Sequence, residues 1–223
     1  GPVSLSIDQF FLLGLYSQEY IYIPRNANGE LVVTTSIFQR ATRLPIWMHS
    51  IAAIGTIGFF QFIQGKLDAS YAASLHPVDY FTGQTSFSAE TIKGYYAQMQ
   101  GTETLDIYWQ TQVIDFGFIL AMVCMGLFVI TLIARLSRPE SLGRRLGIYG
   151  GLSVTLGAIC DAIENGWSFI MLANPTGFAD WLALPYSGFA SIKFAFITLG
   201  MLLTLLSIVS SGIGRAANKP SIG

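Results

Sequence analysis

LGIYGGLSVTLGAICDAIENGWSFIMLA, residues 146–173, is an apolar run without proline that ends shortly before Pro175. A helix needs about 20 apolar residues to cross a bilayer, so this run is long enough to span one. Asp161 and Glu164 lie one helical turn apart in its second half, with Asn165 beside them. Because a carboxylate in hydrocarbon costs about 2.5–3.5 kcal/mol or more, these groups are expected to face a protein interior. The pattern therefore predicts a membrane protein with a buried polar site.

The composition places most of the chain in a membrane. Of its 223 residues, 52% are hydrophobic and 11% are charged, and the mean hydropathy is +0.53. Soluble domains carry roughly 25% charged residues, so much of this surface is expected to contact the lipid bilayer. A net charge of −1 argues against a nucleic-acid partner. Cys124 and Cys160 lie in apolar runs and are expected to pack there, and no motif predicts a metal site.

Hydropathy predicts an all-α membrane protein, a bundle of four transmembrane helices. Pro45 precedes the first span and suits a first helical turn. A short basic loop joins the second span to the third, and a turn with proline and glycine leads into the fourth. The expected spans are residues 46–64, 111–134, 146–173 and 187–211, with the loop at 135–145, the turn at 174–186 and a tail at 212–223.

The N-terminal arm, residues 1–45, has a mixed pattern. Its apolar run at residues 7–16 is too short to span a bilayer and is expected to lie in the interface. A turn signal at residues 26–29 and a β-prone run at residues 31–35 predict a small hairpin after it. An arm that packs on a partner is the alternative.

Residues 65–110 are expected to form a polar cap between the first two spans. Ser86 or Ser88 can begin a short helix that stops at Gly101. The cap is rich in aromatic residues, which favours an interfacial belt over an entrance to the polar site. These residues are Tyr80, Tyr95, Tyr96, Tyr108 and Trp109.

Basic residues in short loops predict the orientation of the bundle. Only Lys66 and Lys93 lie on the side of the cap, which is therefore expected to be extracytoplasmic. Both termini are expected on the cytoplasmic side, or on the matrix or stromal side in an organelle. The basic residues of that side are Arg40, Arg43, Arg135, Arg138, Arg144, Arg145, Arg215 and Lys219.

Three spans carry ionisable groups at a similar depth. With a rise of 1.5 Å per residue, these groups lie roughly 6–16 Å below the outer helix ends. They also fall on polar stripes with spacings of three, four and seven residues, which predicts that they face one another. We expect Lys193 to pair with Asp161, Glu164 or Asp115. The predicted polar cluster comprises Gln112, Asp115, Asp161, Glu164, Asn165 and Lys193.

The charges of this cluster do not balance, because three carboxyls face one ammonium. At least one carboxyl is therefore expected to hold a proton near neutral pH. His49 lies away from the cluster and is expected to be a hydrogen-bonded packing residue, not a haem ligand. No cofactor is predicted, and a bound lipid or pigment is the alternative.

Three classes of function fit the pattern. The favoured one is a non-catalytic subunit or assembly partner of a larger membrane complex, or a self-associating chain, in which the buried charges fix helix register. The second is a membrane enzyme, an isomerase, cyclase or hydrolase of a lipid or isoprenoid-like substrate. Asp161 and Glu164 would then be its acid and base, with Asp115 and Lys193 adjusting their protonation. The third is a small proton or ion channel or carrier.

Overall fold

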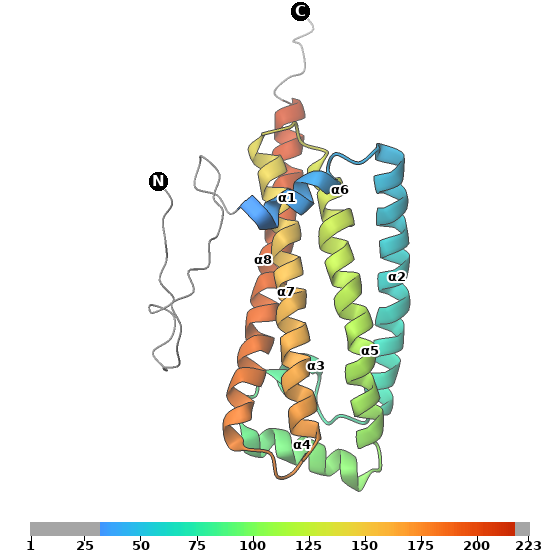
Figure 1. Cartoon of the computed structure of the whole chain (residues 1–223), viewed down its shortest axis with the longest axis vertical. Helices are drawn as coiled ribbons and strands as arrows, with labels where there is room; N and C mark the ends of the chain where they lie inside the picture. Colours follow the sequence, from blue (N-terminus) through green and yellow to red (C-terminus); the bar gives the residue numbers. More distant parts are fainter. Residues whose placement is uncertain (1–31, 217–223) are drawn as a thin grey trace, which may run out of the picture.

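The computed structural model describes residues 32–216, and this part of the chain is helical throughout, without a strand (Figure 1). Four long helices run antiparallel to their neighbours in sequence, and short helices lie at both ends of them (Figure 1). The elements are α1 (Val32–Ala41), α2 (Ile46–Ala73), α3 (Tyr80–Gln84), α4 (Ala89–Gly101), α5 (Leu105–Cys124), the π-helix η2 (Met125–Ile130), α6 (Thr131–Ala134), α7 (Leu142–Leu172), the 3-10 helix η3 (Asp180–Leu182) and α8 (Ala183–Ala216).

Within residues 32–216, four helices are long and apolar enough to cross a membrane, which agrees with the four predicted spans, and the all-α class is confirmed for this part of the chain. They are longer than the sequence pattern indicated, since α2 continues past residue 64 and the second span begins at Leu105, not at residue 111. At 28–33 residues, the spans measure about 42–50 Å against a hydrocarbon core of about 30 Å. In a bilayer, their ends would therefore reach into the headgroup layers.

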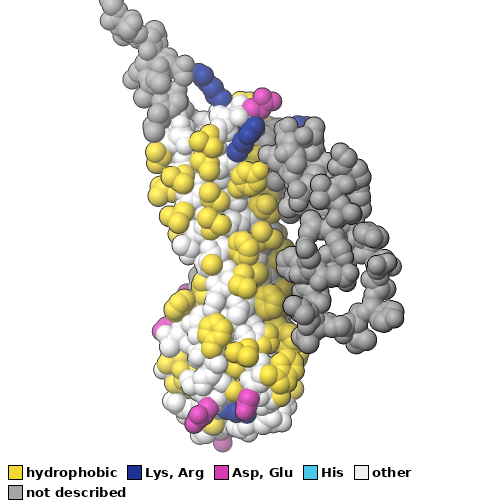
Figure 2. Space-filling model, turned by 90° about the vertical axis from the view of Figure 1, so that its left-hand side faces the viewer, with side chains coloured by type: hydrophobic (Ala, Val, Ile, Leu, Met, Phe, Trp, Pro, Cys, Tyr) yellow, Lys and Arg dark blue, Asp and Glu magenta, His cyan; other side chains and the backbone are white. Residues whose placement is uncertain are grey.

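Helix α7 is the central helix of the structure. It packs along α8 over most of its length and also contacts α5, η2 and α1, whereas α2 packs mainly on α5 and η2. Figure 2 shows a largely hydrophobic face with charged side chains gathered toward its two ends. Such a face suits contact with lipid tails.

Small residues bring α7 and α8 close together. A Cβ atom added at Gly200 would lie 2.5 Å from Cγ2 of Val154 and 2.9 Å from the carbonyl oxygen of Gly150. A Cβ at Gly150 would lie 2.7 Å from Oγ1 of Thr204. Glycine at these positions is therefore required by the close approach of the two backbones. Further along the same contact, the Ser207 hydroxyl donates to the carbonyl oxygen of Gly143 at 2.6 Å.

The predicted β-prone run is wrong for residues 32–35, because they form the first turn of α1. Helix α1 lies across one end of the bundle (Figure 1), where Phe38 is buried in a cluster with Ala134 and Ile148. This tertiary packing outweighs the strand preference of β-branched residues, which is strongly dependent on context. The predicted interfacial helix at residues 7–16 and the turn at 26–29 lie outside the described residues.

The His49 side chain links α2 to the second span through hydrogen bonds at the C-terminal part of the π-helix and just after it. Its side chain is fully buried, and its Nε2 lies 2.9 Å from the Phe128 carbonyl oxygen and 3.1 Å from Oγ1 of Thr131. Arg135 donates from Nη1 to His49 Nδ1 at 3.1 Å and to the Leu44 carbonyl oxygen at 2.7 Å. The expected packing role of His49 is thus matched by hydrogen bonds at both ring nitrogens.

At the opposite end, residues 74–104 connect α2 to α5 and lie over the ends of α7 and α8 (Figure 1). Ser88 begins α4 as predicted, since its hydroxyl accepts a hydrogen bond of 3.2 Å from the Thr91 amide. Lys93 forms an ion pair of 2.5 Å with Asp180 in η3. These contacts hold α4 against the α7–α8 turn.

Candidate functional site

The polar site is centred on Lys193 of α8, whose ammonium contacts two carboxylates of α7. Its Nζ lies 2.6 Å from Oδ1 of Asp161 and also bonds to Oε2 of Glu164. All three side chains are at most about 5% exposed. The predicted pairing of Lys193 with Asp161 and Glu164 is therefore confirmed.

A second polar contact joins α7 to α5. The Asn165 amide nitrogen donates to Oδ2 of Asp115 at 2.7 Å, and both side chains are buried. Asp115 is also near enough to Asp161 and Lys193 to interact with their charges. Two carboxyl groups from α7, one ammonium from α8 and a third carboxyl from α5 thus lie close together in the interior of the bundle.

Helix geometry explains why these residues meet. Positions 161, 164, 165 and 168 lie on one side of α7, because residues three, four and seven apart share a helix face. Asp115 lies about 15 Å from the start of α5, and Lys193 lies about 15 Å from the start of α8. Since α5 and α8 begin at the same end of the bundle (Figure 1), both side chains reach the level of Glu164.

Gln112, the sixth residue of the predicted cluster, lies one turn before Asp115 on α5. Its side chain is 3% exposed, but it makes no hydrogen bond to the other five residues, and its Oε1 has no hydrogen-bond partner. The structure therefore brings five predicted residues into one charged network and places Gln112 at its border.

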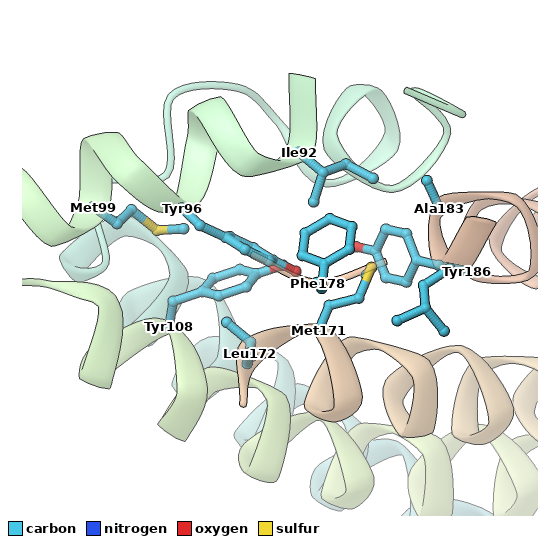
Figure 3. Close-up of a cluster of buried hydrophobic side chains, with 10 residues drawn as sticks. Ile92, Tyr96, Met99, Tyr108, Met171, Leu172, Phe178, Ala183 and Tyr186 are labelled. Carbon is cyan, nitrogen blue, oxygen red and sulfur yellow. The ribbon is translucent and has the colours of Figure 1, made fainter. Parts of the chain in front are cut away.

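Three buried tyrosines cover the network on the side of α4. Tyr96 of α4 and Tyr108 of α5 point toward Tyr186 of α8, around Phe178 (Figure 3). Tyr108 and Tyr186 lie close to each other, and all three phenols lie near enough to Glu164 to interact with its charge. The expected interfacial belt is therefore wrong for Tyr96 and Tyr108, whereas Trp109 is 49% exposed, as a belt residue would be.

Six buried side-chain atoms in residues 32–216 have no hydrogen-bond partner, and four of them belong to one stretch of α7. A buried polar atom without a partner costs about 1–3 kcal/mol, so such a group of atoms in one region is unusual for a purely structural core. Ser168 and Tyr96 lie near each other without completing a hydrogen bond. The atoms are Tyr96 OH, Gln112 Oε1, Glu164 Oε1, Asn165 Oδ1, Trp167 Nε1 and Ser168 Oγ.

Three groups in the connection between α2 and α5 have shifted pKa values. Burial raises the pKa of the Tyr96 phenol above its ordinary value, so this hydroxyl is a neutral donor. Burial also lowers the pKa of His76, which contacts the Tyr71 hydroxyl at 2.9 Å from Nδ1. The pKa of Asp79 is lowered by its hydrogen bonds from the backbone and side chain of Thr82, which stabilise the start of α3.

Within residues 32–216, no group of three His, Cys, Asp or Glu side chains is placed to hold a metal ion. Cys124 and Cys160 are free thiols on different spans. The side chains of this site supply carboxyls, an ammonium, amides and hydroxyls. Searches against protein-family models, curated proteins and solved structures find no match to this chain.

Proposed function

We propose that the protein is a membrane-embedded enzyme that moves protons on the polar head of a lipid or isoprenoid-like substrate. The observation that carries this proposal is the hydrogen bonding of the Glu164 carboxyl group. One of its carboxyl oxygens bonds to Lys193, while the other, Oε1, is buried without a partner. A buried carboxyl oxygen without a partner is suited to take a proton from a bound molecule or to give one to it.

The surroundings of Glu164 supply the other groups that such a reaction needs. Asp161 is the second carboxyl on Lys193, so the ammonium can support a negative charge on either residue as a proton moves. The Ser168 and Tyr96 hydroxyls and the Trp167 ring nitrogen can donate to a substrate oxygen, because none of them has a partner. The hydrogen bond between Asn165 and Asp115 would hold α5 against the part of α7 that carries Glu164.

The depth of Glu164 fits a lipophilic substrate. It lies about 12 Å from the C-terminal end of α7. If α7 is centred in the bilayer, each of its ends extends about 8 Å beyond the hydrocarbon core. The carboxyl therefore lies only about 4 Å inside the hydrocarbon boundary, where the head of a membrane-dissolved molecule would be found. An isomerase, a cyclase or a hydrolase could work with proton transfer alone, with water as the second reactant of a hydrolase.

The proposal can be tested by comparing what copurifies with the wild type and with Glu164→Gln. A variant without the proton-transfer group should retain substrate, and the wild type should carry product or nothing. We expect a lipophilic molecule in the variant that differs in mass or in retention time from any in the wild type. Asp180→Asn removes an exposed carboxyl instead, and it should match the wild type. Identical extracts from all three proteins would contradict the proposal.

A second candidate is a non-catalytic subunit or assembly partner. The observation that favours it is Lys193, which is satisfied by two carboxylates and ties α8 to α7 as a structural residue would. In that case, mild solubilisation should isolate the chain with other membrane subunits or as a self-associated form. Lys193→Met should then disperse that assembly, and no lipid difference should appear in Glu164→Gln.

We also propose an orientation, on the basis of the basic residues. Arg40, Arg43, Arg138 and Arg145 lie at the end with α1, whereas Lys66 and Lys93 lie toward the end with α4. By the positive-inside tendency, the α1 end faces the cytoplasm, matrix or stroma, and residues 74–104 face the other side. Cysteine labelling with an impermeant reagent at Thr102 and at Ser141 would test this, since only Thr102 should react in intact cells.

A further inference from the structure

A cavity of about 430 Å³ lies at the α1 end of the bundle, far from the polar site along the spans. It is formed where α1, the α6–α7 connection and the start of α7 meet. Its lining contains three arginines and one acid, which leaves it with an excess of positive charge. The charged and polar residues that line it include Gln39, Thr42, Arg43, Glu140, Arg144 and Arg145.

The arginines that line this cavity have N–H groups that do not donate to any described residue. The Arg43 and Arg145 guanidinium groups make no side-chain hydrogen bond or ion pair within residues 32–216. Arg144 makes one long contact of 3.4 Å from Nη2 to the Thr42 carbonyl oxygen, and Arg135 is near enough to repel it. Three guanidinium groups that line one cavity with a single carboxylate, Glu140, favour the binding of an anion between them.

The level of the cavity indicates where such an anion would come from. Helix α7 is 31 residues long, or about 46 Å, and so extends about 8 Å beyond the hydrocarbon core when centred. Arg144 and Arg145 lie in its first turn, about 4 Å outside that core, which is the layer of lipid phosphates. Ile148 and Tyr149 continue the lining along α7, on the side of the membrane interior.

We propose that this cavity is a binding site for a phosphate-bearing anion, which the headgroup of an anionic phospholipid would supply from the membrane. Arginine pairs with phosphate through two parallel hydrogen bonds, and basic pockets between membrane helices take up anionic headgroups. Glu140 is the one opposing charge among the lining residues and would disfavour a ligand that carries a further negatively charged group. The site is independent of the chemistry proposed for Glu164.

The test uses the purified full chain in phosphatidylcholine nanodiscs, titrated separately with phosphatidylglycerol, with more phosphatidylcholine and with inorganic phosphate. Bound lipid is counted by native mass spectrometry, and thermal stability is followed in parallel. We expect retention of phosphatidylglycerol over phosphatidylcholine, with a rise in melting temperature. A response to inorganic phosphate alone would keep the site but assign it to a free phosphate compound. No response to either anion would overturn the proposal.

Matched variants make the test specific to the cavity. Arg43→Gln with Arg145→Gln removes two lining arginines and should weaken phosphatidylglycerol retention about 30-fold, at roughly fivefold for each basic group. Arg40→Gln with Arg138→Gln removes the same charge from exposed positions outside the lining and should retain the lipid. Arg43→Lys with Arg145→Lys keeps the charge and should lose only part of the affinity. Equal retention by the two glutamine pairs would overturn the proposal.

Discussion

Lys193 Nζ lies 2.6 Å from Oδ1 of Asp161, and the same ammonium bonds to Glu164 one turn further along α7. One buried cation therefore pairs with two carboxylates of a neighbouring helix. The stability of the α7–α8 pair should depend on this one side chain more than on any surface charge.

Lys193→Met should destabilise the folded protein by about 3–5 kcal/mol, because it leaves two buried carboxylates without a counter-charge. Unfolding in mixed detergent micelles, followed by tryptophan fluorescence, would measure this loss. Lys93→Met is the matched control, since its partner Asp180 is 81% exposed and the Lys93–Asp180 pair should contribute at most about 1 kcal/mol. Equal effects of the two substitutions would contradict the prediction.

Infrared spectroscopy should detect a protonated carboxyl in the wild type near neutral pH. Asp115, Asp161 and Glu164 share one ammonium, so full ionisation would leave two negative charges uncompensated in a buried site. The band should disappear or shift in Asp115→Asn or in Glu164→Gln. Its absence from the wild type would show that water or a cation reaches the cluster.

Gly200→Ala should destabilise the protein by about 1–3 kcal/mol, because its methyl group would collide with Val154 and with the Gly150 carbonyl. Gly58→Ala is the control, since nothing lies within 4 Å of a Cβ added there. That change should be neutral or stabilising by up to about 1 kcal/mol through helix propensity. Thermal unfolding of both variants in one detergent would compare them.

The hydrogen bonds of His49 predict which ring nitrogen carries its proton. Arg135 donates to Nδ1, so Nε2 must bear the hydrogen that bonds to the Phe128 carbonyl. Nitrogen NMR of labelled protein should find the Nε2–H tautomer. His49→Phe should cost about 1–3 kcal/mol by leaving those partners unpaired, whereas Met48→Leu on the exposed side of α2 should be neutral.

The α2–α5 connection should loosen in acid. Burial lowers the pKa of His76 below its ordinary value of 6.5, so the unfolded segment binds a proton that the folded one resists. The contribution of His76 to stability is therefore complete above pH 6.5 and is lost as the pH falls toward the folded pKa. Hydrogen exchange in residues 74–104 should accelerate over that range, and His76→Gln should reduce the acceleration. An unchanged pH dependence in the variant would argue against His76.

The charged network could be predicted because its geometry depends on constants of the helix. A fixed rise per residue gave the shared level of Asp115, Glu164 and Lys193, and the 3.6-residue period gave their facing sides. Within a bilayer, polar side chains have few alternatives to the bundle interior. The Lys193 pairing therefore followed from spacing alone.

The tyrosines over the network could not be predicted in the same way. Tyr96 is buried because α4 lies across the bundle end and meets Phe178 and Leu182, which follow α7 by several residues of turn. No periodicity within the connection encodes that contact. Aromatic residues near a membrane surface are typical of an interfacial belt, so this more common pattern was expected. The free oxygen of Glu164 likewise depends on side-chain positions, which spacing does not specify.

The π-helix η2, Met125–Ile130, divides the second span into two parts that are rotationally offset. A wider turn accommodates an additional residue, so side chains beyond it are displaced by about 100° from a continuous α-helical wheel. Thr131 and Arg135 reach His49 only after that offset. Losing a single amino acid between positions 125 and 130 would therefore rotate Thr131 and Arg135 away from His49 and toward the acyl chains, so this short segment should tolerate insertions and deletions less well than its uniformly apolar composition suggests.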